Sequence, residues 1–154
     1  MSESARAGTT DVLTAIHVLE YPYKRSVGPV IGRFLTGLIE GRIQGIKTSS
    51  GKVMVPPVEY DPETAAALSE FVDVADSGVV ETWAWVSEPR QNNPLHKPFA
   101  WALIKLDGAD TAFLHAVDAG SESAMKTGMR VKARWRAERV GHITDIESFE
   151  PEGA

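Results

Sequence analysis

The sequence predicts a mainly β protein with a helical addition, in which five short strands close into a small barrel. Five extended segments follow Glu70, an amphipathic segment precedes them, and the composition is that of an ordinary globular protein, with 43% hydrophobic and 24% charged residues in a chain of 154. A compact chain of this length buries roughly two thirds of the surface that its unfolded form exposes. Neither a disulfide nor a metal is therefore needed to stabilise the core.

Three regions are expected along the chain: a flexible lead-in over residues 1–25, a helix plus a hairpin over 26–68, and the barrel over 69–151. The helix is predicted from Ser26 to about Glu40, because apolar residues recur there at spacings of three and four. These residues are Val27, Val30, Ile31, Phe34, Leu35, Leu38 and Ile39. Ser26 is placed to cap the helix and Gly41 to end it.

A small hairpin is expected after the helix. Two short β-like runs within residues 42–57 flank a turn at residues 48–51, and the pair Pro56 and Pro57 closes the second run. Residues 61–64 then predict a turn or the start of a further helix.

The barrel is predicted from five segments separated by turn signals. They are Phe71–Val86, Phe99–Leu106, Thr111–Val117, Met129–Arg136 and Ile143–Phe149. Gly78 permits a bulge in the first and longest segment, and residues 107–110 form a hairpin turn between the second and third. Five such strands are typical of a closed Greek-key barrel of the OB type, whereas an immunoglobulin-like sandwich needs about seven.

Alternation along the first two barrel strands predicts an unusual outer surface. Successive side chains of a strand point to opposite faces, so Trp83 and Trp85 share one face of the first strand, and the rings of the second strand also share one face. An outer wall of four aromatic rings would be an exposed apolar patch of a size that monomers rarely carry. Together with the helix, it gives the predicted partner-binding residues Phe34, Leu38, Trp83, Trp85, Phe99 and Trp101. Two other interpretations stay open: the helix of the same chain covers the wall, or the rings point inward.

Four cations alternate along the fourth predicted strand. They are Arg130, Lys132, Arg134 and Arg136. Such a row is either solvated and paired with Glu138, Asp145 or Glu147, or it contacts the phosphates of a ligand such as coenzyme A or an acidic partner. A single-stranded nucleic-acid binder is an alternative, because OB barrels can stack bases beside a basic groove. The formal net charge of −5 makes it the least favoured one, and we predict no nucleic-acid partner.

Groups for catalysis are scarce in the sequence. Cysteine is absent, the four histidines lack ligand-like spacing, and no nucleophile elbow, phosphate loop or dinucleotide fingerprint occurs. We therefore predict no catalytic residue and no metal site, and keep a free-standing enzyme acting on CoA esters, with Asp107, His115 or His96 as base, as an alternative. The N-terminus lacks an apolar signal region and no stretch approaches about 18 apolar residues, which predicts a cytoplasmic protein without a membrane partner.

The order of these elements carries a family resemblance. A leading helix is followed by a Pro-Pro-terminated hairpin, by a Pro98-Phe99-Ala100 run that leads into Leu106-Asp107-Gly108, and by Gly128-Met129-Arg130-Val131. In this order and spacing the chain resembles, from Val27 to Pro151, the acyl-CoA-associated OB-fold proteins known as domain of unknown function 35 (DUF35).

The resemblance implies a non-catalytic accessory subunit. Members of the family bind thiolase-like or lipid-transfer-protein-like enzymes, and in some cases hydratases, that act on CoA thioesters such as those of fatty-acyl or steroid side chains. The OB-fold subunit helps to form the acyl-CoA site of that enzyme. The resemblance thus implies a hetero-oligomer in lipid metabolism or steroid degradation, with no cofactor bound by this chain and a CoA thioester as a possible ligand of the complex.

Members of the family also carry a rubredoxin-like zinc knuckle made by two pairs of cysteines around the Pro-Pro. The matching positions here are Lys47, Ser50, Asp61 and Thr64. These side chains cannot form a tetrahedral thiolate site, so the resemblance implies a degenerate, metal-free hairpin held by the packing of Val53, Val55 and the proline pair. An ion pair between Lys47 and Asp61, worth about 0–1 kcal/mol if exposed, could add to it.

Overall fold

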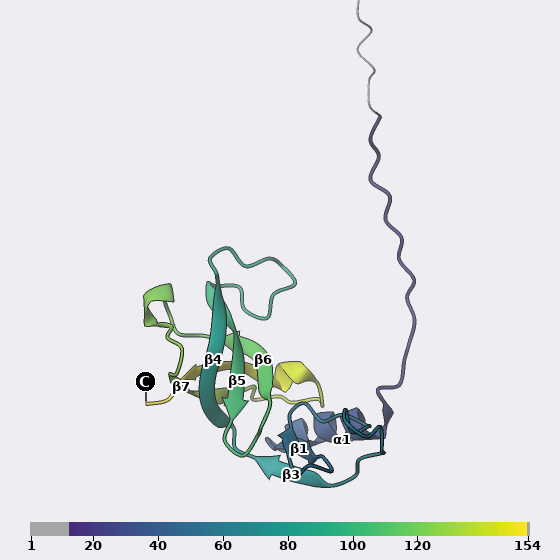
Figure 1. Ribbon diagram of the computed structural model, residues 1–154. Coiled ribbons are helices and arrows are strands. Elements are labelled where there is room, and N and C mark those ends of the chain that lie inside the picture. The colour runs from purple at the N-terminus through teal and green to yellow at the C-terminus, as the bar shows by residue number, and fades with distance from the viewer. Residues whose placement is uncertain (1–12, 154) are drawn as a thin grey trace, which may run out of the picture.

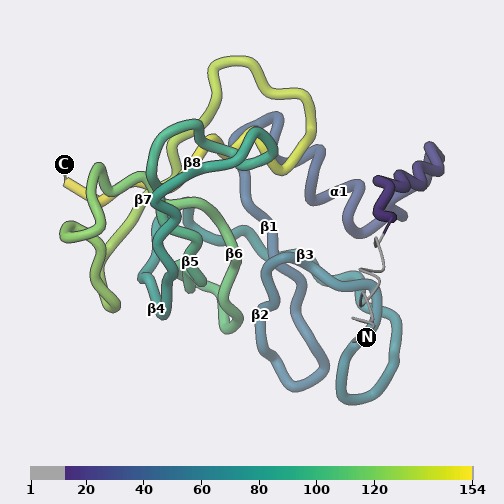
Figure 2. Tube along the Cα trace, turned by 90° about the horizontal axis from the view of Figure 1, so that it is seen from above, coloured from purple at the N-terminus to yellow at the C-terminus, as the bar shows by residue number. Residues whose placement is uncertain are grey.

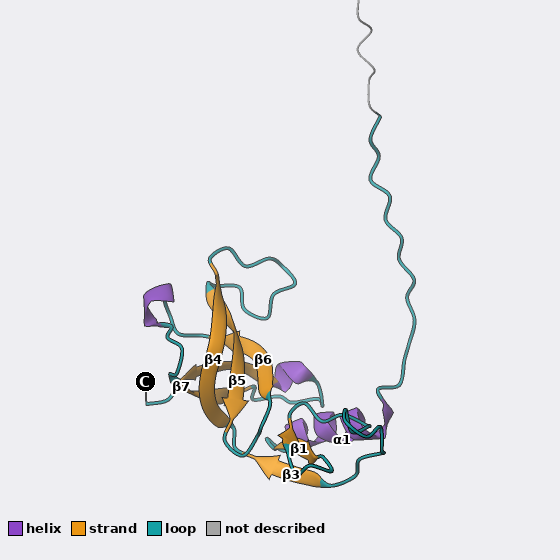
Figure 3. Cartoon of the chain, viewed as in Figure 1, coloured by secondary structure: helices purple, strands orange, loops and turns teal. Residues whose placement is uncertain are grey.

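Five strands close into a barrel, and three further strands form a small sheet beside it (Figure 1). The computed structural model describes residues 13–153. The small sheet, in the order β2-β1-β3, contains β1 (Ile43–Lys47), β2 (Val53–Met54) and β3 (Phe71–Val74). The barrel contains β4 (Ser77–Val86), β5 (Phe99–Leu106), β6 (Ala112–Val117), β7 (Arg130–Trp135) and β8 (Ile146–Pro151). Figure 3 separates these strands from the α-helix α1 (Gly28–Ile39) and the short 3-10 helices η1 (Glu122–Ala124) and η2 (Ile143–Asp145).

The strand order of the barrel is β4-β5-β6-β8-β7, and β7 pairs back to β4. Numbered within the barrel this is 1-2-3-5-4, a Greek-key order in which the third and fifth strands run parallel and all other neighbours are antiparallel. The predicted OB-type barrel is thereby confirmed.

Helix α1 begins and ends close to its predicted bounds. The Ser26 hydroxyl accepts a hydrogen bond from the Gly28 amide at 3.3 Å, and Gly41, with φ of 72°, ends the helix. The Gly41 amide donates to the Leu38 carbonyl and the Arg42 amide to the Gly37 carbonyl, which is the Schellman arrangement that a left-handed glycine permits.

The longest predicted strand differs from the structure in two ways. It is divided at Ala75 and Asp76, so that β3 pairs with β1 and only β4 enters the barrel, which therefore begins at Ser77 rather than at residue 69. The bulge lies between Val80 and Thr82 and not at Gly78. Gly78 has another role: a Cβ at this position would overlap the Lys105 carbonyl oxygen, so the glycine lets β4 and β5 approach closely.

The core of the barrel is continuous with the side of α1 that faces it. Ile104, Val131 and Phe149 fill the barrel without solvent exposure, and Phe34 and Leu38 of α1 join the same cluster. Figure 2, viewed from above, shows α1 and the small sheet on one side of the barrel. Most of the stabilisation of α1 comes from burying this face, because a single helix of 12 residues is marginal in water.

Residues 13–27 extend away from the body of the protein (Figure 1). The lead-in predicted for residues 1–25 falls partly on residues 1–12, which lie outside the described residues. Within residues 13–153, no helix is long and apolar enough to cross a membrane.

Candidate functional site

The bulge at Glu81 divides the predicted aromatic wall between the two sides of the sheet. Beyond the bulge, Trp83 pairs with Ala102 and Trp85 with Ala100. Directly paired residues share a face, and both alanines are buried inside the barrel. The two indoles therefore lie on the inner side of the sheet, partly buried against the main core. The prediction of one outer wall of four rings is wrong, because a one-residue shift in register reverses the faces.

Phe99 and Trp101 lie on the other, outer side of the same strands. A chain segment between β4 and β5 covers them: Leu95 of this loop packs on Phe99, and Val86 and Trp101 complete a second small cluster. The rings of Phe99 and Trp101 meet edge to face, with centroids 5.3 Å apart. Phe99 is fully buried, as are Phe34 and Leu38 of α1. Phe99, Phe34 and Leu38 therefore stabilise the fold and are not available as a docking surface.

The exposed apolar surface lies elsewhere. Within residues 13–27, which we call the arm, the large apolar side chains are exposed: Leu13, Ile16, Val18, Leu19, Tyr21, Tyr23 and Val27. A second, smaller exposed pair is Leu103 and Leu114, which are directly opposite on the outer face of β5 and β6. With Ile39, Tyr60 and Val140, these are the large apolar side chains that are exposed within the described residues, whereas the predicted indoles are partly buried.

The predicted row of cations on β7 is largely neutralised by the chain itself. The Arg130 guanidinium donates to both oxygens of Asp107 and to Glu152, at 2.6–2.8 Å. These hydrogen bonds from Arg130 lower the pKa of Asp107 and raise the pKa of Arg130. One cation among two carboxylates leaves a net charge of −1, so this end of the row does not attract an anion.

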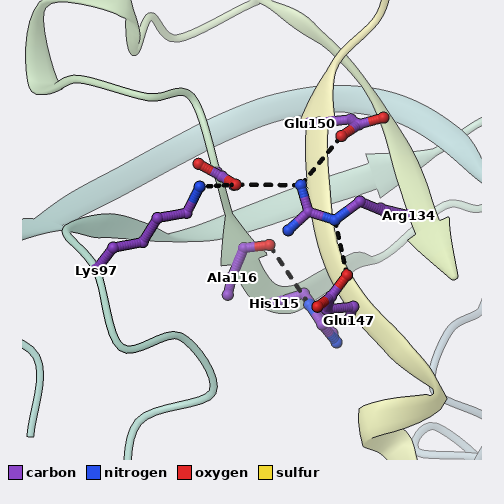
Figure 4. Close-up of polar contacts among 7 residues, drawn as sticks. Lys97, His115, Ala116, Arg134, Glu147 and Glu150 are labelled. Carbon is purple, nitrogen blue, oxygen red and sulfur yellow. Dashed lines mark hydrogen bonds and ion pairs between the residues drawn. The ribbon is translucent and has the colours of Figure 1, made fainter. Parts of the chain in front are cut away.

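Arg134 lies in a second ion-pair cluster (Figure 4). It donates to Glu147 at 2.8 Å, to Asp118 at 3.1 Å and to Glu150 at 3.2 Å, and Lys97 of the β4–β5 loop contacts Asp118 at 2.7 Å. Burial opposes the charge of Asp118, but hydrogen bonds from Lys97 and Arg134 outweigh burial and lower its pKa. The cluster fastens the loop to the barrel. Of the three carboxylates predicted to face the cations, Glu147 is confirmed, whereas Asp145 accepts backbone amides of residues 140–142 instead.

Lys132 and Arg136 are the remaining cations of the row. Both are exposed, and neither forms an ion pair within residues 13–153. The contacts thus reduce the predicted phosphate-binding residues from four to two. Two separated cations are a weak basis for holding a nucleic-acid backbone, so the structure does not favour that alternative.

The degenerate knuckle is held by a carboxylate at one of the four positions. Asp61 is buried and accepts hydrogen bonds from the backbone amides of Ser49 at 2.8 Å, Glu63 at 2.8 Å and Thr64 at 3.2 Å. The amide of Ser49, followed by those of Glu63 and Thr64, holds the pKa of Asp61 at about 2. This one side chain joins the turn after β1 to the turn at residues 61–64 by a polar link.

The side chains at the other three positions do not contact Asp61. Lys47 pairs with Glu70 at 3.1 Å, so the predicted ion pair with Asp61 is not formed. The Ser50 hydroxyl contacts that of Thr48 at 3.0 Å, and the Thr64 hydroxyl accepts a bond from the Ala66 amide. Val55 packs in the main core as predicted, and Thr111 adds two hydrogen bonds to its backbone.

The three candidate bases of the enzyme alternative are not assembled into one site. Both oxygens of Asp107 are bound by Arg130, and His96 lies exposed in the β4–β5 loop. His115 is buried between Phe113 and Phe149, where desolvation lowers its pKa. Sequence reasoning missed Asp118, the carboxylate that pairs with both Lys97 and Arg134. No spacing in the sequence links it to Lys97 and Arg134, which come from other strands and loops.

The fold and these sites define a small OB-fold protein in which Arg130, Arg134 and Asp61 are held by contacts within the chain. A sequence model described as "ChsH2, C-terminal OB-fold domain" matches residues 71–136. This match agrees with the resemblance to DUF35 OB-fold proteins that the sequence predicted. No curated protein matches the chain.

Two solved structures show the same fold. One is a protein of unknown function from the DUF35 family of Sulfolobus solfataricus, with 24% identity and a TM-score of 0.56 over 70% of this chain and 77% of that one. The other is described as the Ltp2-ChsH2(DUF35) aldolase, with 16% identity and a TM-score of 0.61 over 83% of this chain and 98% of that one. At identities of 24% and 16%, the likeness shows a shared fold and nothing beyond the fold.

Proposed function

We propose that this chain is a non-catalytic accessory subunit of a lipid-transfer-protein-like or thiolase-like enzyme that acts on acyl-CoA thioesters. The observation that carries the proposal is the match of residues 71–136 to the OB-fold domain of ChsH2. The structural likeness to the chain of the Ltp2-ChsH2(DUF35) aldolase spans 98% of that chain and supports the same assignment. The candidate bases of this chain are occupied, buried or apart from one another, so the chemistry would belong to the partner.

The arm is the surface best suited to hold the partner enzyme. Its large side chains include Leu19, Tyr21 and Tyr23, which are 65–79% exposed. Tyrosine supplies a large contact area at a small cost in side-chain entropy, and it is enriched among the residues that dominate interface energies. An extended segment that binds an apolar groove would bury these side chains and order the arm in the complex.

The proposed role of the barrel is to face the acyl-CoA site of the partner. Lys132 of β7 and Arg136, the residue that follows β7, form no ion pair in the described residues, and they are the candidates for contact with CoA phosphates. Trp101, at the outer face of β5, remains a candidate for partner contact because it is partly exposed. Trp83 and Trp85 are partly buried against the core, so only the exposed edges of their rings remain candidates for partner contact.

The test is co-expression of the full chain with a tagged lipid-transfer-protein-like or thiolase-like enzyme from the same operon. We expect the two chains to elute together at a constant ratio. In the variant Leu19→Ser/Tyr21→Ser/Tyr23→Ser, recovery of this chain with the tagged enzyme should fall at least about tenfold, as expected when several hot-spot side chains are removed.

Glu122→Ser/Ser123→Ala is the matched control, because both residues are exposed on η1 at the surface of the barrel. It should co-purify like the unmodified chain. A chain that stays separate from every such enzyme, or an arm variant that binds as well as the control, would contradict the proposed subunit role or the proposed docking segment, respectively.

A further inference from the structure

A pocket of about 390 Å³ opens between β6 and β8. These two strands are paired at a single register position, Val117 with Phe149, and they diverge from there. Helix η2 and the β4–β5 loop line the resulting gap, which reaches the side chain of His115 inside the barrel. The volume lies within the range of about 300–1,000 Å³ that is usual for small-molecule sites.

The walls of the pocket are mainly apolar. Trp101 and Leu114 come from the outer side of β5 and β6, Ile143 comes from η2, and Ile146 begins β8. The Trp101 ring is held by its edge-to-face contact with Phe99. A flat indole in a fixed orientation, opposed by branched aliphatic side chains, is suited to a ligand with a flat apolar body.

The polar lining contains one cation without a counter-ion in the described residues. Glu147 accepts a hydrogen bond from the Arg134 guanidinium at 2.8 Å, and Asp118 and Glu150 share that guanidinium. His115 is buried, and desolvation lowers its pKa, so its imidazole is neutral at pH 7. Arg136 is exposed and forms no ion pair within residues 13–153. Its guanidinium is therefore the one charged group of the lining without a counter-ion in the described chain, and it attracts an anion.

We propose that the pocket between β6 and β8 binds a small organic acid with a flat apolar body, which packs on Trp101, Ile143 and Ile146 while its acid group faces Arg136. This binding is a property of the chain alone. It does not depend on the proposed partner enzyme, so a negative result for ligand binding would not contradict the subunit role, and the reverse also holds.

The experiment is an NMR titration of the full chain with naphthoate and with its neutral amide, naphthamide. The Trp101 indole signal and the backbone signals of Leu114 and Ile143 should shift saturably, with a Kd for naphthoate of about 1 mM, as expected for a probe of this size. Naphthamide should bind about fivefold more weakly, because the charge-assisted hydrogen bond to Arg136 is missing and the site is partly open to solvent.

Arg136→Gln should remove the preference for naphthoate over naphthamide and leave the weaker binding of the amide unchanged. Lys105→Gln is the matched control, because it removes an exposed cation of the barrel that does not line the pocket; it should keep the preference. Both positions are exposed, so the variants should fold. The proposal is overturned if neither probe gives saturable shifts of the pocket signals, if the shifts map to the arm, or if the preference survives in Arg136→Gln.

Discussion

The barrel and the knuckle beside it are stabilised by different means. The barrel has a core of fully buried apolar side chains such as Ile104, Val131 and Phe149, which come from strands far apart in the sequence. The knuckle is small, and a single carboxylate, Asp61, joins its two turns by accepting three backbone amides. The polar link depends on an ionised carboxylate, so the knuckle is sensitive to acid, whereas apolar burial in the barrel is not.

The largest expected effect is loss of packing in the barrel. Phe149→Ala should lower the free energy of unfolding by about 3–5 kcal/mol, because Phe149 is fully buried and leaves a cavity. Phe71→Ala in β3 is the matched change beside the knuckle, where the ring is partly exposed under the Arg33 guanidinium. It should cost about 1–2 kcal/mol. Urea unfolding measures both, and equal losses would contradict the difference between the two regions.

A second test concerns the close approach of β4 and β5. Gly78→Ala should destabilise by about 1–3 kcal/mol, because the added methyl group would overlap the backbone of β5. Gly32→Ala is the control within α1, where the new Cβ would lie 3.9 Å from Val27. Thermal unfolding should show stabilisation by about 0.5–1 kcal/mol for this control. If Gly78→Ala leaves the free energy of unfolding unchanged, β4 and β5 can move apart at no energetic cost, which would contradict the role of this glycine.

The ion-pair cluster around Asp118 should contribute less than the apolar core. Asp118→Asn should destabilise by about 1–3 kcal/mol, since Lys97 and Arg134 lose a shared carboxylate that is 7% exposed. Glu122→Gln, an exposed change on η1, should stay within about 0.5 kcal/mol of the unmodified chain. Hydrogen exchange in the β4–β5 loop should also be faster in Asp118→Asn. Unchanged exchange would show that the ion pair between Lys97 and Asp118 does not anchor this loop.

The smallest effect is the acid response of the knuckle. The pKa of Asp61 is about 2 in the folded chain, below its ordinary value of 3.8, so its ionised form stabilises the folded state. This stabilisation is complete above about pH 4 and is lost as the pH falls toward 2. The protection of the Ser49 amide, which is its exchange rate compared with that of an unprotected amide at the same pH, should therefore decrease as the pH falls over this range. In Asp61→Asn the exchange should be faster at neutral pH and lack that step; the same pH step in both proteins would assign it to other carboxyl groups.

The helix and the barrel could be predicted because their signals are local and repeated. The spacing of apolar residues in α1, the Gly41 terminus and the turn at residues 107–110 all act within a few residues. The Glu81 bulge could not be predicted in the same way: the run from Val80 to Thr82 has no glycine, and the extra residue is fixed only by pairing with β5. That single residue moved Trp83 and Trp85 to the inner side.

The polar contacts were the least predictable part of the candidate site. The row of cations was expected to face Glu138, Asp145 or Glu147, and Arg134 does pair with Glu147, because the two lie on neighbouring strands. Asp118 and Lys97 come from a strand end and a loop whose approach depends on closure of the barrel. Asp61 carried a local signal, since an Asp before Pro-Glu-Thr often accepts amides two and three residues later, but its bond to Ser49 required the tertiary fold.

The central claim, that this chain is a subunit of an acyl-CoA enzyme, is tested most directly by native mass measurement. The full chain and its candidate lipid-transfer-protein-like or thiolase-like partner are purified separately, mixed at equal concentration and weighed under non-denaturing conditions. We expect a species whose mass is the sum of both proteins in a fixed ratio, with this chain alone showing no turnover of acyl-CoA thioesters. Two unchanged masses, or turnover by this chain without the partner, would contradict it.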